Sequence, residues 1–237
     1  MDISVPSVGF HATLKVSSAS FRLLESHDFH IADALIKLGK GPWAGYIPGI
    51  ELWSPTYCEG DTRIVGPAFT VKMVDKSDTT SPVPTEHFAD AAHEGSVIVI
   101  SAPPGVRNAV WGGLMSARAQ SKGCQGVVID GNVRDLNEHR QMKFPVFARS
   151  HSILPQNAFV RPSEVQVPIT LSRESPVIVH PGDIIVADLD GIVAIPQDLV
   201  EQVIMNCEKY VAIDDQCMEA LKEGHGVKET FAKYRGT

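Results

Sequence analysis

The sequence is poor in cysteine, and its four cysteines, Cys58, Cys124, Cys207 and Cys217, include no CxxC pair. Their spacing predicts neither a zinc site nor a disulfide framework, so we expect reduced thiols in a cytoplasmic protein. No segment approaches the roughly 18 consecutive apolar residues of a membrane-spanning helix. The first residues also lack the basic and then apolar pattern of a secretory signal. We therefore expect no membrane partner.

Positive charge is scarce as well. The 237 residues include 21 Lys+Arg against 28 Asp+Glu, which gives a formal net charge of −7. Nucleic-acid binding requires a basic face that neutralises phosphates, so we expect no nucleic-acid partner. A small anion needs only a local positive pocket and is not excluded. Hydrophobic residues make up 43% of the chain, which is enough for the core of one α/β domain.

Several enzyme signatures are missing. The chain has no GxGxxG or GxxxxGK[ST] loop for a dinucleotide or ATP, no GxSxG nucleophile turn and no HExxH zinc motif. The histidines His87, His93 and His151 have no partner signal, and we expect them to be structural. His139 follows Asp135 by one turn of a predicted helix and could border a pocket.

Hydrophobic periodicity predicts one domain of mixed α/β structure. We expect a loose arm over residues 1–18 and a single domain over residues 19–237. The expected strands cover residues 63–74 with a kink at Gly66-Pro67, and residues 96–101, 126–130, 145–148, 177–179, 184–187 and 191–195. The expected helices are two short ones within 21–38, one through 87–93, one over 110–122, a turn over 136–141, and a long C-terminal helix over 199–223.

The first chemical motif is the glycine pair Gly112-Gly113, which opens the helix predicted over 110–122. A helix start presents unpaired N–H groups and a partial positive charge, and glycine lets a ligand approach the backbone closely. The pair therefore favours a site in which backbone amides hold a carboxylate. The alternative is that the pair is only a tight turn onto the helix.

The second motif is DGNVRD, from Asp130 to Asp135, directly after a buried strand. Ligand sites of open α/β sheets lie beyond the carboxyl ends of strands. Arg134 suits a carboxylate or a carbonyl oxygen, and Asp135 suits Mg²⁺ or Mn²⁺, which prefer oxygen ligands. A surface ion pair between the two is the alternative. Together with the glycine pair, the motif favours a small-acid lyase.

These segments resemble the RraA-like family, which includes class II 4-hydroxy-4-methyl-2-oxoglutarate aldolases that also decarboxylate oxaloacetate. The resemblance covers about residues 32–224 and rests on DAL, GPA, GGLMSARA, GVVIDGNVRD and VHPGDIIVADLDGIVAIP. It implies an αββα sandwich of the swivelling β/β/α type. It also implies a homotrimer, or two trimers paired as a homohexamer, with the active site in a cleft between subunits.

The resemblance assigns roles to individual positions. It implies that Asp135 is the metal ligand, that Arg134 contacts the 2-oxo group, and that the amides of Leu114 and Met115 hold the substrate carboxylate. It also implies a further metal ligand from the neighbour's C-terminal helix, for which Asp214 or Glu208 is available.

One departure stands out, because characterised aldolases of the family carry an acidic residue at the position of Gly113. That residue is implicated in activating the water that protonates the enolate. Arg118, one turn further along the helix, could reach such a pocket and change the substrate choice.

The motifs and the resemblance together predict a lyase that needs Mg²⁺ or Mn²⁺ and cleaves a carbon–carbon bond of a small 2-oxo acid. The C3–C4 bond would break to leave an enolate, in retro-aldol cleavage, in decarboxylation of oxaloacetate, or in both. One alternative is a protein-binding regulator without catalysis, as in some members of the family. Another is a lyase for a larger 2-oxo acid, for which Gly113 would make room.

Overall fold

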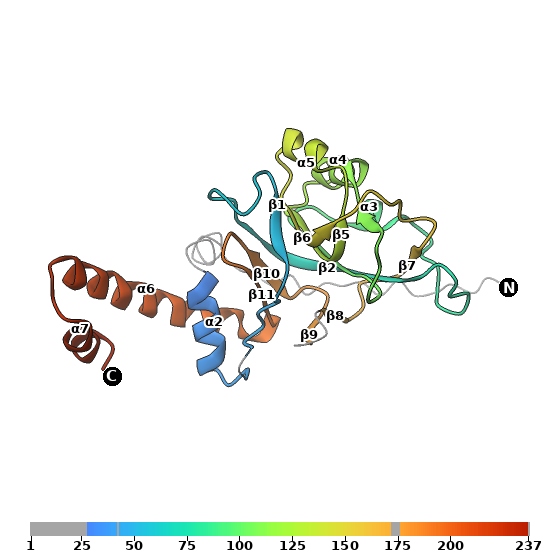
Figure 1. The fold of residues 1–237 in the computed structure, drawn as a ribbon. Helices are drawn as coiled ribbons and strands as arrows, with labels where there is room; N and C mark the ends of the chain where they lie inside the picture. Colours follow the sequence, from blue (N-terminus) through green and yellow to red (C-terminus); the bar gives the residue numbers. More distant parts are fainter. Residues whose placement is uncertain (1–27, 42, 172–175, 237) are drawn as a thin grey trace.

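A curled mixed sheet of nine strands forms the centre of the fold (Figure 1). The computed structural model describes residues 28–41, 43–171 and 176–236. The strands of this sheet are β1 (Glu51–Ser54), β2 (Ile64–Asp75), β3 (Val97–Ser101), β4 (Ala109–Trp111), β5 (Gly126–Val133), β6 (Val146–His151), β7 (Val160–Val165), β10 (Ile184–Ala187) and β11 (Ile192–Ile195). A separate hairpin consists of β8 (Ile169–Leu171) and β9 (Val177–Val179).

The middle of the sheet is parallel. Strands β2, β3, β5 and β6 lie side by side, and their Val- and Ile-rich segments are buried, as is typical of parallel strands covered on both faces. Strand β2 changes partner along its length: Ile64–Pro67 pairs with β10, and Ala68–Lys72 pairs with β3. The expected kink at Gly66-Pro67 lies at this change. A Cβ atom at Gly66 would come within 2.4 Å of the Gly95 carbonyl oxygen, so the close approach requires glycine.

Helices cover both sides of this β structure. On one side α3 (Phe88–Ala91), α4 (Gly113–Ser121) and α5 (Leu136–Met142) pack on the parallel strands. The opposite face of these strands packs against the β8–β9 hairpin and the β10–β11 pair. Helix α2 (Asp28–Lys37) and the start of α6 (Val200–Lys222) cover β10 and β11. The order is helices, strands, strands, helices, which confirms the predicted αββα architecture.

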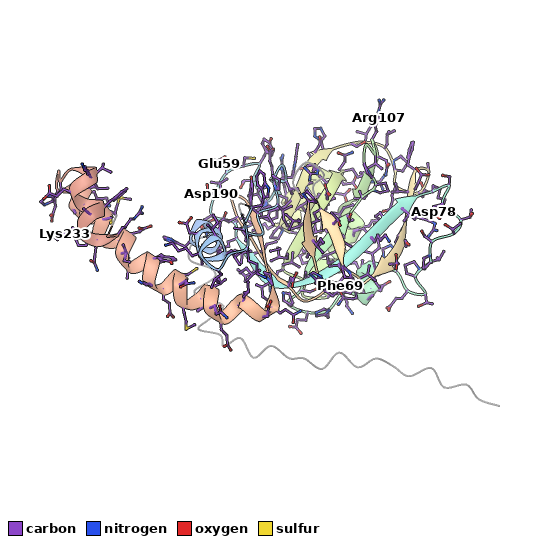
Figure 2. The ribbon with its side chains drawn as sticks, turned by 90° about the horizontal axis from the view of Figure 1, so that it is seen from below. Glu59, Phe69, Asp78, Arg107, Asp190 and Lys233 are labelled. Atoms are coloured by element: carbon purple, nitrogen blue, oxygen red, sulfur yellow. The ribbon has the colours of Figure 1, made fainter. Side chains whose placement is uncertain are left out.

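The second half of α6 extends away from the sheet as an arm, and α7 (Val227–Tyr234) folds back at its end (Figures 1 and 2). Lys233 of α7 lies at the opposite end of the molecule from Arg107 and Asp78 in Figure 2. The base of the arm is held by α2, where the Lys37 ammonium lies 3.6 Å from the centre of the Tyr210 ring. No helix in the described ranges is long and apolar enough to cross a membrane.

Most of the predicted elements are confirmed, with shifted ends. The prediction was wrong at the start of the helix over 110–122, because Ala109–Trp111 pairs with β5 as strand β4 and the helix begins only at Gly113. Strands β1, β7 and β8 and helix α7 were not predicted. All four cysteines are free thiols, as expected. The arm predicted over residues 1–18 and the first short helix predicted after residue 20 lie outside the described residues.

Candidate functional site

A cavity of about 290 Å³ lies where β4 leads into α4 and β5 leads into α5. It is open to solvent, and both sequence motifs contribute to its wall. Its lining residues are His87, Ala109, Val110, Trp111, Gly112, Leu114, Met115, Arg134, Asp135, Pro155, Gln156 and Asn157. Five of the predicted site residues, Gly112, Leu114, Met115, Arg134 and Asp135, are therefore brought together.

Strand pairing explains why the two motifs meet. Trp111 at the end of β4 pairs with Val133 at the end of β5, and the Arg134 amide donates to the Trp111 carbonyl at 3.0 Å. The buried Trp111 indole donates to the Ser116 hydroxyl at 2.8 Å, which fixes α4 against β4. The two turns that follow these strands are thus tied by hydrogen bonds before any ligand is considered.

Asp135 occupies the turn between β5 and α5 in the left-handed conformation, with φ 60° and ψ 42°. Its Oδ2 accepts a hydrogen bond from the Gly113 amide at 3.0 Å and lies 3.4 Å from Arg134 Nε. The carboxylate therefore sits at the start of α4, where the helix dipole favours negative charge. About one third of its side chain remains exposed, so a ligand can reach it.

The backbone amides at the start of α4 are only partly free. The Met115 amide donates to the Gly112 carbonyl at 3.0 Å, and the Gly113 amide donates to the Asp135 carboxylate. The Leu114 amide has no partner among the described residues. Of the two amides that the family resemblance assigns to the substrate carboxylate, only that of Leu114 is thus available in this arrangement.

The glycine pair makes room for side chains from the neighbouring turn. A Cβ atom at Gly112 would come within 2.5 Å of Asp135 Oδ2 and 3.1 Å of Arg134 Nε. A Cβ atom at Gly113 would lie 1.6 Å from Glu138 Oε2 and 2.9 Å from Glu138 Cβ. The space that Gly113 leaves is thus filled by Glu138 of α5, and Gly113 itself is buried outside the cavity wall. The room expected for a larger substrate at Gly113 does not exist in this structure.

His139 lies beneath the site rather than at its edge. The side chain is buried, and Nε2 lies 2.6 Å from the Arg134 carbonyl oxygen. Burial is the main cause that lowers the pKa of His139, against the opposite effect of this hydrogen bond. The neutral ring therefore donates from Nε2 to Arg134, and it fixes the backbone that carries Arg134 and Asp135.

Two predicted site residues are engaged elsewhere. Arg118 is exposed, donates from Nε to Asp90 at 2.6 Å, and does not line the cavity. Asp214 on α6 accepts two hydrogen bonds from Arg235, the shorter at 2.5 Å, and lies 3.8 Å from the buried His30. Helix α6, which carries Asp214, extends away from α4 and α5 within one copy of the chain (Figure 1). A contact between Asp214 and the site would have to come from a second copy.

The donor set in the cavity suits a hard divalent cation that keeps several waters. No group of three His, Cys, Asp or Glu side chains that could hold a metal occurs within the described ranges. Asp135 is the only carboxylate in the cavity wall, and no hydrogen bond occupies its Oδ1 in the described structure. Mg²⁺ is commonly bound through one or two carboxylates, with water and substrate oxygens as its other ligands. Asp135 fits that role.

A second part of the wall, formed by other segments of the chain, was not predicted. It consists of His87, at the start of α3, and of Pro155, Gln156 and Asn157, in the connection between β6 and β7. These residues come from loops without hydrophobic periodicity. No sequence signal marked His87, whose Nδ1 accepts a hydrogen bond from the Ala89 amide and so caps α3 in the structure.

Comparisons with known proteins find one family profile and several relatives. The profile of the RraA-like family, described as Aldolase/RraA, matches residues 31–194. An uncharacterised protein of Methanocaldococcus jannaschii is 33% identical over 176 residues, which cover 73% of this chain and 80% of that protein. A protein of Halalkalibacterium halodurans named "Putative 4-hydroxy-4-methyl-2-oxoglutarate aldolase" is 31% identical over 161 residues, which cover 68% of this chain and 73% of that protein.

Solved structures share the fold. The crystal structure of an uncharacterised protein from Pseudomonas syringae pv. tomato superposes with a TM-score of 0.76 at 28% identity, over 90% of this chain and 97% of that one. RraAS2 of Streptomyces coelicolor, described as an unusual member of the RNase ES inhibitor RraA protein family, gives a TM-score of 0.69 at 22% identity. That similarity covers 88% of this chain and 98% of RraAS2, and it concerns the fold alone.

Proposed function

Because the chain belongs to the RraA-like family, we propose that it is a metal-dependent lyase that cleaves a carbon–carbon bond of a small 2-oxo acid. The observation that carries the proposal is the single cavity lined by Arg134, Asp135 and the start of α4. A cation, a free carboxylate oxygen and a backbone amide there suit the 2-oxo and carboxylate groups of such an acid. The name of the Halalkalibacterium halodurans relative supports an aldolase.

Arg134 and the Leu114 amide bind and orient the substrate. The Arg134 side chain is about 40% exposed, so its guanidinium can donate to the 2-oxo oxygen. The Leu114 amide donates to the carboxylate at the positive end of α4. When the C3–C4 bond breaks, its electron pair passes to the 2-oxo oxygen and gives an enolate, whose negative charge Arg134 stabilises. The rest leaves as CO₂, or as a carbonyl fragment whose former C4 hydroxyl gives its proton to water. A proton from water then adds at C3 and completes pyruvate or its homologue.

Asp135 would hold Mg²⁺ or Mn²⁺, which when bound supplies Lewis acidity for the developing oxyanion. His139 keeps the Arg134–Asp135 turn in place through the Arg134 carbonyl. The finer expectations belong to the same proposal: a cytoplasmic homotrimer or homohexamer with the site between subunits, and Asp214 or Glu208 as a ligand from the neighbour. In this scheme Arg118 forms an ion pair with Asp90 and does not bind the substrate.

The test measures pyruvate release from oxaloacetate and from 4-hydroxy-4-methyl-2-oxoglutarate, with Mg²⁺ and with EDTA. Asp135→Asn is the sharpest variant, because asparagine tolerates the left-handed conformation and removes only the charge. Asp61→Asn, at an exposed aspartate outside this cavity, is the matched control. We expect release that EDTA and Asp135→Asn abolish and Asp61→Asn leaves intact. Activity that survives both would refute the metal site at Asp135, whereas no release from either substrate would refute the lyase function and favour a protein-binding regulator.

A further inference from the structure

His87 is the one ionisable side chain in the cavity wall that the lyase scheme does not use. His87 lies in the loop before α3, 47 positions before Arg134 in the sequence, and the fold brings both residues to the wall of one cavity. The ring is exposed on the cavity side and stacks on the buried Phe88, with ring centres 4.5 Å apart. Its plane is therefore held by packing rather than left to rotate freely.

A backbone hydrogen bond sets which ring nitrogen carries the proton. Nδ1 accepts from the Ala89 amide at 3.2 Å and so caps the start of α3. An acceptor nitrogen has no hydrogen, so the proton of the neutral ring is on Nε2. Nε2 has no partner among the described residues, and the ring therefore offers an N–H donor to whatever occupies the cavity.

The same hydrogen bond argues against His87 as a proton acceptor. The only free lone pair of the ring is on Nδ1, and it faces the Ala89 N–H. The side chain can therefore donate a hydrogen bond from Nε2. Its ligand partner is an acceptor oxygen, such as that of a carboxylate or carbonyl group, and not a hydroxyl group that needs a base.

The charges of the wall indicate which part of a ligand faces His87. Arg134 is the only cation among the described lining residues, and with Asp135 it binds the 2-oxo acid group under the proposed function. The other polar side chains of the lining are those of His87 and of the neutral amides Gln156 and Asn157. The part of a substrate that Arg134 and Asp135 do not bind therefore meets uncharged polar groups.

Resting on the proposed lyase function, we propose that His87 binds the departing half of the substrate, by donating a hydrogen bond from Nε2 to an oxygen of that half. The substrate is then a 2-oxo acid whose far end carries a carboxylate or carbonyl oxygen. His87 acts in substrate recognition and does not exchange a proton during the reaction.

The test separates the two halves of the substrate by binding, without turnover. Calorimetry in the presence of Mg²⁺ measures the Kd of pyruvate, which has only the 2-oxo acid group, and of 2-oxoglutarate, which adds a distal carboxylate but no hydroxyl to cleave. His87→Asn is the chosen variant because asparagine is a good N-cap and keeps α3, while its short side chain lacks the Nε2 donor. His225→Asn, at an exposed histidine, is the matched control.

We expect the wild type to bind 2-oxoglutarate more tightly than pyruvate. His87→Asn should weaken 2-oxoglutarate binding by about tenfold, the value of one hydrogen bond to a charged group, and leave pyruvate binding unchanged. Equal weakening of both ligands, no weakening of either, or no preference in the wild type would overturn the role of His87. If the wild type binds neither acid and releases no pyruvate, the lyase function fails, and this inference with it.

Discussion

Gly113 and Glu138 form a pair whose energetics can be tested by a double-mutant cycle. The φ of Gly113 is not positive, so alanine suits the backbone, and at the start of α4 it gains up to about 1 kcal/mol of helix propensity. The new Cβ atom, however, would lie 1.6 Å from Glu138 Oε2 and 2.9 Å from its Cβ. The whole Glu138 side chain must turn aside, and such overpacking typically costs about 1–3 kcal/mol. We expect Gly113→Ala to destabilise the protein by about 1–2 kcal/mol.

The cost should depend on Glu138. Glu138 is exposed, so Glu138→Ala alone should change stability by at most about 1 kcal/mol. In that background the two nearest carboxylate atoms are gone and only the Cβ atom at 2.9 Å remains, so most of the cost of Gly113→Ala should disappear. Urea unfolding of the four proteins gives the coupling free energy, which we expect to be about 1–2 kcal/mol. Glu201→Ala, on the distant α6, serves as the control background and should restore nothing. The same cost of Gly113→Ala in all three backgrounds would refute the argument that Glu138 fills this space.

Three further results are expected. Gly112→Ala should lower kcat/KM of the proposed lyase by roughly a hundredfold, because its Cβ displaces the Asp135 carboxylate from a position 2.5 Å away; wild-type kinetics would contradict this. His139→Leu should lower the free energy of unfolding by about 1–3 kcal/mol, measured in urea, because the Arg134 carbonyl loses its buried donor; an unchanged midpoint would count against that role. Hydrogen bonds from Ser81, and then from Thr80, hold the pKa of Asp78 below its ordinary value of 3.8. This carboxylate therefore stabilises the fold above about pH 3.8 and loses that effect as pH falls further. An NMR titration should show Ser81→Ala raising the pKa, and an unmoved pKa would exclude this cause.

The part of the site between Trp111 and Asp135 could be predicted because it is contiguous in sequence. Each motif combines a buried strand, a turn and a helix start, and neighbouring parallel strands place both turns at one edge of the sheet. The contact between Gly113 and Glu138 could not be predicted, because it depends on how α5 packs on α4. The position of His87 in the cavity wall could not be predicted either. His87 lies in a loop without periodicity, and the cavity wall is formed by segments that are distant in sequence.

The missed elements have similar causes. Strand β7 contains Pro162, which argues against a strand in sequence, yet proline is tolerated there because β7 pairs with β2 alone. Strand β1 has only four residues, too few for alternation to be distinguished from chance. Helix α7 has only eight residues and follows Gly224 and Gly226. Glycines are typical of loops, and so short a helix gives a weak periodic pattern.

At position 135, the residue types that the left-handed backbone favours differ from the aspartate that the proposed function requires. Non-glycine residues with φ near 60° are disfavoured by about 1–2 kcal/mol, whereas glycine adopts this conformation freely and asparagine tolerates it. Selection for stability alone would therefore not protect this aspartate. In a library of variants screened only for resistance to heat or protease, position 135 should drift toward glycine or asparagine while its buried neighbours Val133 and His139 stay fixed. The carboxylate would be retained only in a library that is also selected for the activity or ligand binding of the site.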